Sequence, residues 1–124
     1  MDSLPPVGAF QQYLEQGRFM LQRGRESGRC FYYPRTVEPV TGAIDLEWVE
    51  ASGMGTVYST TTVRQRPPAA DYNLALIDLD EGPRMLSRVE NIDPAQVSIG
   101  MRVQARITRQ DDMPLVVFDP ADAG

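Results

Sequence analysis

Two short stretches of the chain, residues 24–28 and 38–42, share the spacing of a zinc-binding turn. In each stretch two candidate ligand positions lie three residues apart and are followed by a Gly, which suits a turn that passes through positive φ. The four candidate positions hold Gly24, Ser27, Glu38 and Thr41. A structural zinc site needs four thiolate or imidazole ligands, and none of these residues supplies one. The sequence therefore predicts ribbon-like turns without a bound metal.

Few other side chains could carry out acid-base or nucleophilic chemistry. The 124 residues include no His, and all twelve basic residues are Arg, so a His base, a Lys Schiff base and a Cys-His pair are excluded. The single cysteine, Cys30, lies off the ligand pattern and is expected to be a small buried apolar residue. Asp78, Asp80 and Glu81 form the densest acidic group and are interpreted as a strand end and turn. We therefore expect a protein that is not an enzyme.

The charge is acidic overall but uneven along the chain. The formal net charge is -5, which opposes binding of a long polyanion. Residues 18–35 nevertheless carry five Arg against Glu26 alone, and such a local cluster suits a small anion. The N-terminal residues lack the basic region and apolar core of a secretory signal, and no apolar run is long enough to span a bilayer. We expect a cytoplasmic protein with no membrane contact.

The first fifty residues are expected to form a short helix and a small ribbon-like lobe. A helix over residues 5–16 would be capped by Ser3, and its apolar stripe would contain Val7, Phe10 and Leu14. Short strands are expected at residues 19–22, 30–33 and 46–49. Trp48, the only Trp, is expected to anchor the core where the lobe meets the rest of the chain.

The pattern of the remaining chain predicts a β-barrel. Strands are expected at residues 55–66, 73–80, 84–90, 102–109 and 115–118, with a short helix at 93–97. Val57 and Val63 are expected to share one face of the first of these strands. Three strands, a short helix and two strands are the order of an OB-fold. The expected fold is thus mainly β: an N-terminal helix (1–17), a zinc-less ribbon-like lobe (18–50), a five-stranded OB-fold barrel (51–119) and a tail (120–124).

An ordered set of short motifs resembles one known family. The motifs are Leu21-Gln-Arg23, Pro34-Arg35, Leu46-Glu-Trp-Val49, Gly53-Met-Gly55-Thr-Val-Tyr-Ser59, the run 75–84, and Ile99-Gly-Met-Arg-Val103. Together they are similar to acyl-CoA-associated OB-fold proteins with an N-terminal rubredoxin-like zinc ribbon, over roughly residues 8 to 119. The family's four Cys ligands would fall on the positions that hold Gly24, Ser27, Glu38 and Thr41 here. The ribbon is therefore a degenerate one.

The resemblance implies a non-catalytic accessory subunit that binds acyl-CoA and docks on a thiolase-like or aldolase-like enzyme of lipid metabolism. Coenzyme A carries a diphosphate and an adenine, which Arg forks and aromatic rings can hold. The candidate residues are Arg23, Arg25, Arg29, Phe31, Tyr32, Tyr33 and Arg35. No catalytic residue and no metal are expected, and a homo-oligomer is possible. The alternative is an OB-fold module for single-stranded nucleic acid, with Arg102, Arg106 and Arg109 aligned on one outward face.

Overall fold

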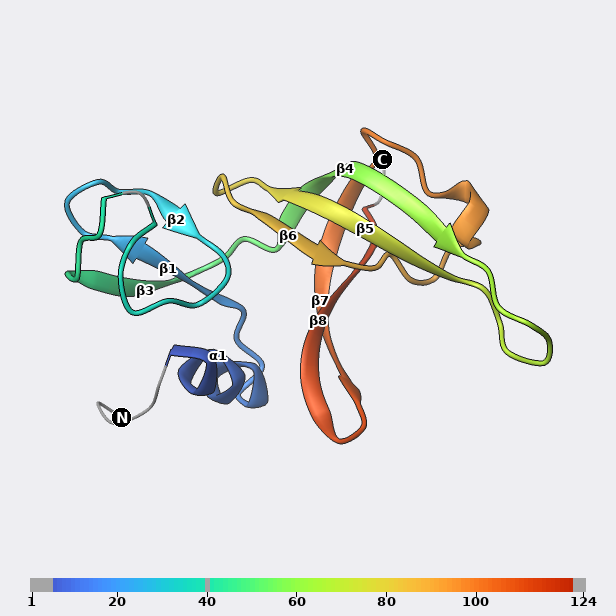
Figure 1. The fold of residues 1–124 in the computed structure, drawn as a ribbon, viewed down its shortest axis with the longest axis horizontal. Coiled ribbons are helices and arrows are strands. Elements are labelled where there is room, and N and C mark those ends of the chain that lie inside the picture. Colours follow the sequence, from blue (N-terminus) through green and yellow to red (C-terminus); the bar gives the residue numbers. More distant parts are fainter. Residues whose placement is uncertain (1–5, 40, 122–124) are drawn as a thin grey trace.

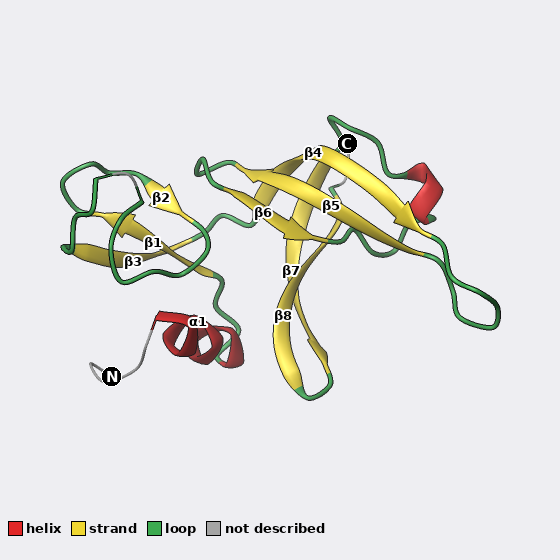
Figure 2. Ribbon diagram, viewed as in Figure 1, coloured by secondary structure: helices red, strands yellow, loops and turns green. Residues whose placement is uncertain are grey.

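The computed structural model describes residues 6–39 and 41–121, which form a helix beside two antiparallel sheets (Figures 1 and 2). Ser3, the expected helix cap, and the end of the expected tail lie outside the described residues. The elements are α1 (Pro6–Glu15), β1 (Met20–Gly24), β2 (Cys30–Phe31), β3 (Leu46–Glu50), β4 (Met54–Val63), β5 (Tyr72–Leu79), β6 (Arg84–Ser87), the 3-10 turn η1 (Pro94–Gln96), β7 (Arg102–Gln110) and β8 (Met113–Pro120). No described helix is long and apolar enough to cross a membrane.

The N-terminal helix docks through two residues of its predicted stripe. Phe10 and Leu14 are buried, one helical turn apart, whereas Val7 is 39% exposed and lies off the contact. Trp48 of β3 is half-buried, and its ring lies 5.3 Å from the ring of Tyr13. The single Trp therefore joins the helix to the ribbon-like lobe. It also packs, partly buried, against the core that the lobe shares with the barrel, where we predicted an anchor.

The ribbon-like lobe is a three-stranded sheet in the order β2-β1-β3. The predicted strand at residues 30–33 is wrong beyond Phe31, because β2 pairs with β1 only at Cys30 and Phe31. The chain leaves the sheet there because the Gln22 side chain binds the following loop. Its Nε2 donates to the carbonyl of Arg35 at 2.7 Å, and its Oε1 accepts from the Arg35 N–H at 2.6 Å.

The second sheet curls into the predicted OB-fold (Figure 2). Its strands lie in the order β6-β5-β4-β7-β8, and η1 comes between β6 and β7 in the chain. The side chain of Asp93 caps η1 by accepting from the N–H of Ala95. The predicted strand over 84–90 divides in two. Residues up to Ser87 pair with β5, and the next residues turn to β8. There the N–H of Phe118 donates to the carbonyl of Arg88, and the carbonyl of Phe118 accepts from the N–H of Glu90. That parallel bridge closes the barrel.

The prediction that Val57 and Val63 share one face is wrong. The register between β4 and β5 shifts between Val57 and Ser59, which marks a bulge in β4. Val57 then pairs with the buried Ile77, whereas Val63 pairs with the exposed Tyr72. A single extra residue reverses the alternation of a strand, so the two valines point to opposite faces.

One hydrophobic core runs through the helix, the ribbon-like lobe and the barrel. Buried side chains from all three contact one another, namely Phe10, Leu14, Phe19, Leu21, Val57, Ile77, Val103 and Phe118. Leu21 of strand β1, together with Phe19 just before it, thus lies in the same core as the barrel strands. The ribbon-like lobe is therefore stabilised by burial against the rest of the chain.

Candidate functional site

Both predicted turns of the ribbon-like lobe are present and have the same geometry. The N–H of Gly28 donates to the carbonyl of Gly24 at 2.8 Å, and the N–H of Gly42 donates to the carbonyl of Glu38 at 2.9 Å. Gly28 and Gly42 have φ of 71° and 72°, a conformation that residues with a Cβ rarely adopt. The sequence pattern therefore identified two real turns that face each other in the fold.

The carboxylate of Glu38 lies between the two turns. Glu38 is only 3% exposed, and its Oε2 accepts a 2.8 Å hydrogen bond from the hydroxyl of Ser27. A Cβ built on Gly24 would overlap Glu38 Oε1 and lie 2.8 Å from the Ser27 oxygen. The Glu38 side chain thus fills the space that a side chain at position 24 would need.

The donor set around Glu38 does not fit a structural zinc ion. One carboxylate and one hydroxyl lie together, and the Thr41 hydroxyl instead accepts from the N–H of Ala43. Within residues 6–39 and 41–121, no group of three or more His, Cys, Asp or Glu is arranged so that it could hold a metal ion. Tetrahedral zinc sites of this type use Cys and His ligands. The hydrogen bond between Ser27 and Glu38 connects the two turns directly.

The four candidate arginines of the lobe divide into two pairs. Arg23 is 2.6 Å from Glu47, and Arg25 lies within 3.3 Å of both Asp45 and Glu47, so these two guanidinium groups are already neutralised. Arg29 and Arg35 are exposed, and neither forms an ion pair with a carboxylate of the described residues. The sequence could not separate the pairs because Asp45 and Glu47, just before and within β3, lie about twenty residues further along.

The three consecutive aromatic residues have three different environments. Phe31 is buried, Tyr32 is half-buried, and Tyr33 is 53% exposed. Tyr32 makes edge-to-face contacts with Tyr33 and with Phe10 of α1, both with ring centroids 5.8 Å apart. Burial, and to a lesser degree the neighbouring Tyr33, raise the pKa of the Tyr32 hydroxyl, which therefore keeps its proton at neutral pH. Tyr33 is the member of the set that is accessible to a ligand.

Cys30 packs against the core, but it is less buried than we predicted. It is half-buried at the edge of the core, and burial raises the pKa of its thiol. The nearby Arg23 favours the thiolate, but this is a smaller effect. A thiol in this environment is a poor nucleophile.

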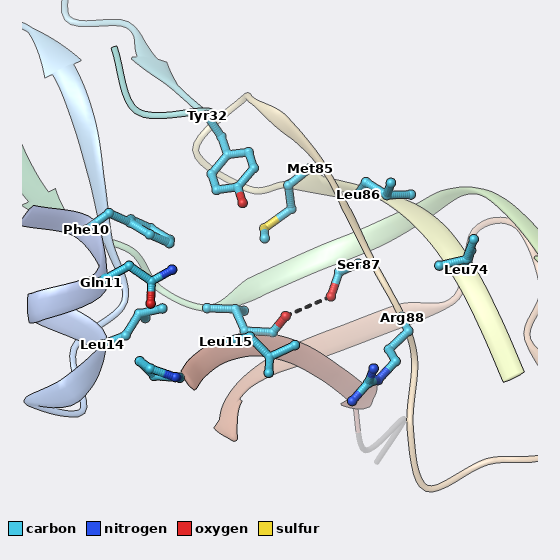
Figure 3. A pocket seen from close by; sticks show the side chains of 12 residues that line it. Phe10, Gln11, Leu14, Tyr32, Leu74, Met85, Leu86, Ser87, Arg88 and Leu115 are labelled. Atoms are coloured by element: carbon cyan, nitrogen blue, oxygen red, sulfur yellow. Dashed lines mark hydrogen bonds between the residues drawn. The ribbon is translucent and has the colours of Figure 1, made fainter. Parts of the chain in front are cut away.

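A cavity that the sequence did not predict lies next to Tyr32. It has a volume of about 300 Å³ and lies between α1, β6 and β8 (Figure 3). We call it the seam cavity, because β6 and β8 are the two edge strands of the barrel sheet. Its lining includes Phe10, Gln11, Leu14, Tyr32, Met85 and Leu115. These residues come from four separate segments, so no local pattern in the sequence could have revealed it.

The arginines proposed for nucleic-acid binding are all paired with carboxylates. Arg102 forms two hydrogen bonds to Asp80, at 2.8 and 2.9 Å. Arg106 bonds both Asp119 and Glu90, and Arg109 bonds Glu15 of α1. The acidic group near residue 80 is also engaged: Asp78 pairs with Arg84, and Glu81 accepts from the N–H of Ser52. These charges are paired within the protein, so a polyanion would have to compete with the carboxylates.

The fold and the lobe define a class: OB-fold proteins with an N-terminal helix and a ribbon-like lobe. The family model described as "ChsH2, C-terminal OB-fold domain" matches residues 48–108. A DUF35 domain-containing scaffold protein of Pyrococcus furiosus is 33% identical over 100 residues, which cover 75% of this chain and 74% of the relative. The chain belongs to this DUF35 family of OB-fold proteins.

Other similar proteins are named as an enzyme subunit and as an aldolase. A probable enoyl-CoA hydratase alpha subunit of Thermomonospora curvata is 34% identical over 111 residues, which cover 86% of this chain but only 35% of that subunit. A solved structure described as "Ltp2-ChsH2(DUF35) aldolase" has a TM-score of 0.82 and 30% identity, and the match covers 97% of this chain and 98% of that chain. The relatives link the family to acyl-CoA metabolism.

Proposed function

We propose that the chain is a non-catalytic accessory subunit that binds acyl-CoA and docks on a thiolase-like or aldolase-like enzyme. Relatives named as a scaffold protein, as a hydratase alpha subunit and as part of an aldolase support an accessory role. The paired states of Asp78, Asp80 and the barrel arginines support the absence of catalytic chemistry, because these groups are engaged in structural contacts.

The observation that carries the ligand proposal is the pair of exposed arginines beside an exposed tyrosine. Arg29 and Arg35 lie on either side of Tyr33 in the chain, and neither is paired with a described carboxylate. Two guanidinium forks can hold the phosphate oxygens of coenzyme A, and Tyr33 offers a face to the adenine. The Gln22 side chain bonds both the N–H and the carbonyl of Arg35. These two bonds fix the loop that presents the Arg35 side chain.

The docking surface in this proposal is the ribbon-like lobe. The hydrogen bond between Ser27 and Glu38 connects its two turns, and its strand β1 packs into the common core. A lobe that keeps its shape in this way can present residues 29–35 to a ligand and to a partner enzyme at the same time. Arg23 and Arg25 are then assigned to the stability of the lobe, through Glu47 and Asp45.

The ligand proposal is tested by titrating coenzyme A into the protein in a calorimeter. Replacing both Arg29 and Arg35 with Ala is expected to weaken binding at least tenfold, because each charged hydrogen bond contributes about 1.5–3 kcal/mol. The matched control replaces Arg64 and Arg66, two exposed arginines in the loop that follows β4. That loop lies at the opposite end of the molecule from the ribbon-like lobe (Figure 1). This control has the same change in net charge and is expected to bind normally. Equal loss in both variants would show that only net charge matters and would overturn the site.

The partner proposal is tested by co-purification from the native host. A thiolase-like or aldolase-like enzyme is expected to elute with the tagged chain. The complex is expected to persist on dilution to micromolar concentration. Recovery of the chain without any such enzyme would contradict the proposal. Turnover of acyl-CoA thioesters by the isolated chain would contradict its non-catalytic part.

The alternative, a module for single-stranded nucleic acid, is opposed by the ion pairs of its three candidate arginines. Phosphate contacts from Arg102, Arg106 or Arg109 would first have to break bonds to Asp80, Asp119 or Glu15. We expect no measurable binding of oligonucleotides in filter assays at low salt. A clear, salt-sensitive affinity would reverse this ranking.

A further inference from the structure

The seam cavity results from the way the barrel closes. Near Phe118 the two edge strands are joined by the backbone bonds of Arg88 and Glu90. Further along, their contact is a hydrogen bond of 2.9 Å from the Ser87 hydroxyl to the carbonyl of Val116. Helix α1 lies over this part of the seam, and the space between it and the strands stays open (Figure 3). The cavity, at about 300 Å³, is at the lower end of the range for small-molecule sites.

The cavity walls suit a narrow and mainly apolar molecule without charge. Phe10, Leu14, Met85 and Leu115 supply the apolar surface. The one charged lining residue, Arg88, is held at the far side by Glu90 and Gln110, so its charge is already paired (Figure 3). A charged ligand would therefore gain little in this space and would lose its hydration.

Two polar groups of the lining lack partners and define what the ligand must offer. The Gln11 carboxamide lines the cavity, and its Oε1 is buried without a hydrogen-bond donor among the described residues. The Tyr32 hydroxyl points into the cavity and makes no hydrogen bond to a described residue (Figure 3). A buried acceptor without a donor costs about 1–3 kcal/mol. A ligand with an amide N–H and an amide carbonyl along an apolar chain would satisfy both groups.

We infer that the seam cavity holds the acyl group and the adjoining amide of an acyl-pantetheine chain. This inference rests on the proposed function and assigns the second half of the same ligand. Tyr32 connects the two halves, because it is three residues from both Arg29 and Arg35, which places its Cα within about 11 Å of each of theirs. The phosphates would lie at the arginines on the surface, and the pantetheine arm would pass Tyr33 and Tyr32 into the cavity.

The test measures affinity against the length of the acyl chain. Coenzyme A and its acetyl, butyryl, hexanoyl and octanoyl thioesters are titrated into the protein. Each buried methylene is expected to strengthen binding about fourfold until the cavity is full. Gln11→Phe adds bulk to the cavity wall and removes its amide acceptor. It should flatten this dependence and weaken coenzyme A itself only about fivefold, the loss of one hydrogen bond. The matched control is Gln12→Phe, the same change at the adjacent exposed position of α1, and it should keep the dependence.

A second variant tests the polar part of the site without altering its shape. Tyr32→Phe removes only the hydroxyl and is expected to weaken every thioester about fivefold, whatever its chain length. Retention of wild-type affinity in this variant would contradict the assigned hydrogen bond. Thermal melting confirms that each variant is folded before it is titrated.

The outcomes separate this inference from the proposed function. Binding of coenzyme A with no dependence on chain length would overturn the inference and leave the proposed function standing. Absence of coenzyme A binding would overturn the proposed function. Acyl-pantetheine, which lacks the phosphates, is then titrated into the protein to decide the inference. Binding that depends on chain length supports the inference, and absence of binding overturns it. If Gln11→Phe instead abolishes co-purification with the enzyme and keeps the chain-length dependence, the cavity is a protein contact and the inference fails.

Discussion

Replacing Glu38 with Ala tests whether a carboxylate has taken over the role of a metal in the ribbon-like lobe. Glu38 is 3% exposed, and its Oε2 lies 2.8 Å from the hydroxyl of Ser27 in the opposite turn. The same hydroxyl accepts from the N–H of Arg29 at 3.1 Å. Removal of the carboxylate therefore takes the acceptor from the Ser27 hydroxyl and breaks the link between the two turns.

The magnitude follows from these contacts. A hydrogen bond to a charged group contributes about 1.5–3 kcal/mol. The one methylene that alanine lacks, Cγ, adds about 0.8 kcal/mol of lost burial. Relief of the desolvated carboxylate opposes both, because a buried charge is costly. We expect a net loss of about 2–3 kcal/mol in the free energy of unfolding, which corresponds to a fall in Tm of about 10 °C for a chain of this length.

The assay is urea unfolding followed by the fluorescence of Trp48, which lies on β3 of the same lobe. Glu26→Ala is the control, because Glu26 is an exposed carboxylate in the first turn, and its loss should change stability by less than about 0.5 kcal/mol. A double-mutant cycle of Ser27→Ala and Glu38→Ala should give a coupling energy of about 1–2 kcal/mol.

Two results would refute this reasoning. If Glu38→Ala destabilises the protein no more than Glu26→Ala, or if the coupling to Ser27 is close to zero, the carboxylate does not connect the turns. If a chelator lowers the Tm of the wild-type protein, a metal stabilises the lobe and the assignment to Glu38 is wrong.

The remaining predictions concern the zinc content of the protein, its loss of stability at low pH and the reactivity of the Cys30 thiol. Elemental analysis of the purified protein should find substoichiometric zinc, and one equivalent would contradict the metal-free lobe. Hydrogen bonds from Arg106 hold the pKa of Asp119 below its ordinary value of 3.8. Burial alone would raise the pKa of Glu90, but hydrogen bonds from Arg106 and Arg88 keep it below its ordinary value of 4.5. The stability from these pairs is present above those ordinary values and lost as pH falls through the lower folded values. Arg106→Met should therefore cost about 1 kcal/mol at pH 7 and progressively less below pH 4 in acid-unfolding curves; a cost independent of pH would contradict this. Cys30 should react with a disulfide reagent at pH 7 severalfold more slowly than a free cysteine, because burial raises the pKa of its thiol; an equal rate would show that it is accessible and unshifted.

Much of the fold could be predicted because it depends on local patterns. The alternation of apolar residues and the turn residues between them gave the order of the barrel strands, and that order identified the OB-fold. Errors occurred where tertiary contacts override the local pattern. The bulge after Val57 reversed one strand face, and the Gln22 side chain ended β2 after Phe31. Neither effect leaves a periodic signal, because each depends on a partner elsewhere in the chain.

The candidate site could be predicted only as a list of residues. The sequence placed four arginines and three aromatic rings in one short segment, but it could not tell which of them are free. Glu47, which neutralises Arg23, lies 24 residues away, and Glu15, which binds Arg109, lies 94 residues away. Which guanidinium group remains available is decided by which strands become neighbours.

The sequence by itself determined the class of fold and the lack of zinc ligands, because both follow from residue types at fixed spacing. The tertiary structure alone decided that Glu38 fills the space between the turns, that Arg29 and Arg35 are the exposed pair, and that a cavity opens at the seam. The physical reason is the same for each. Burial, ion pairing and empty volume belong to contacts between distant segments, and those contacts exist only once the helix, the lobe and the barrel have packed on one core.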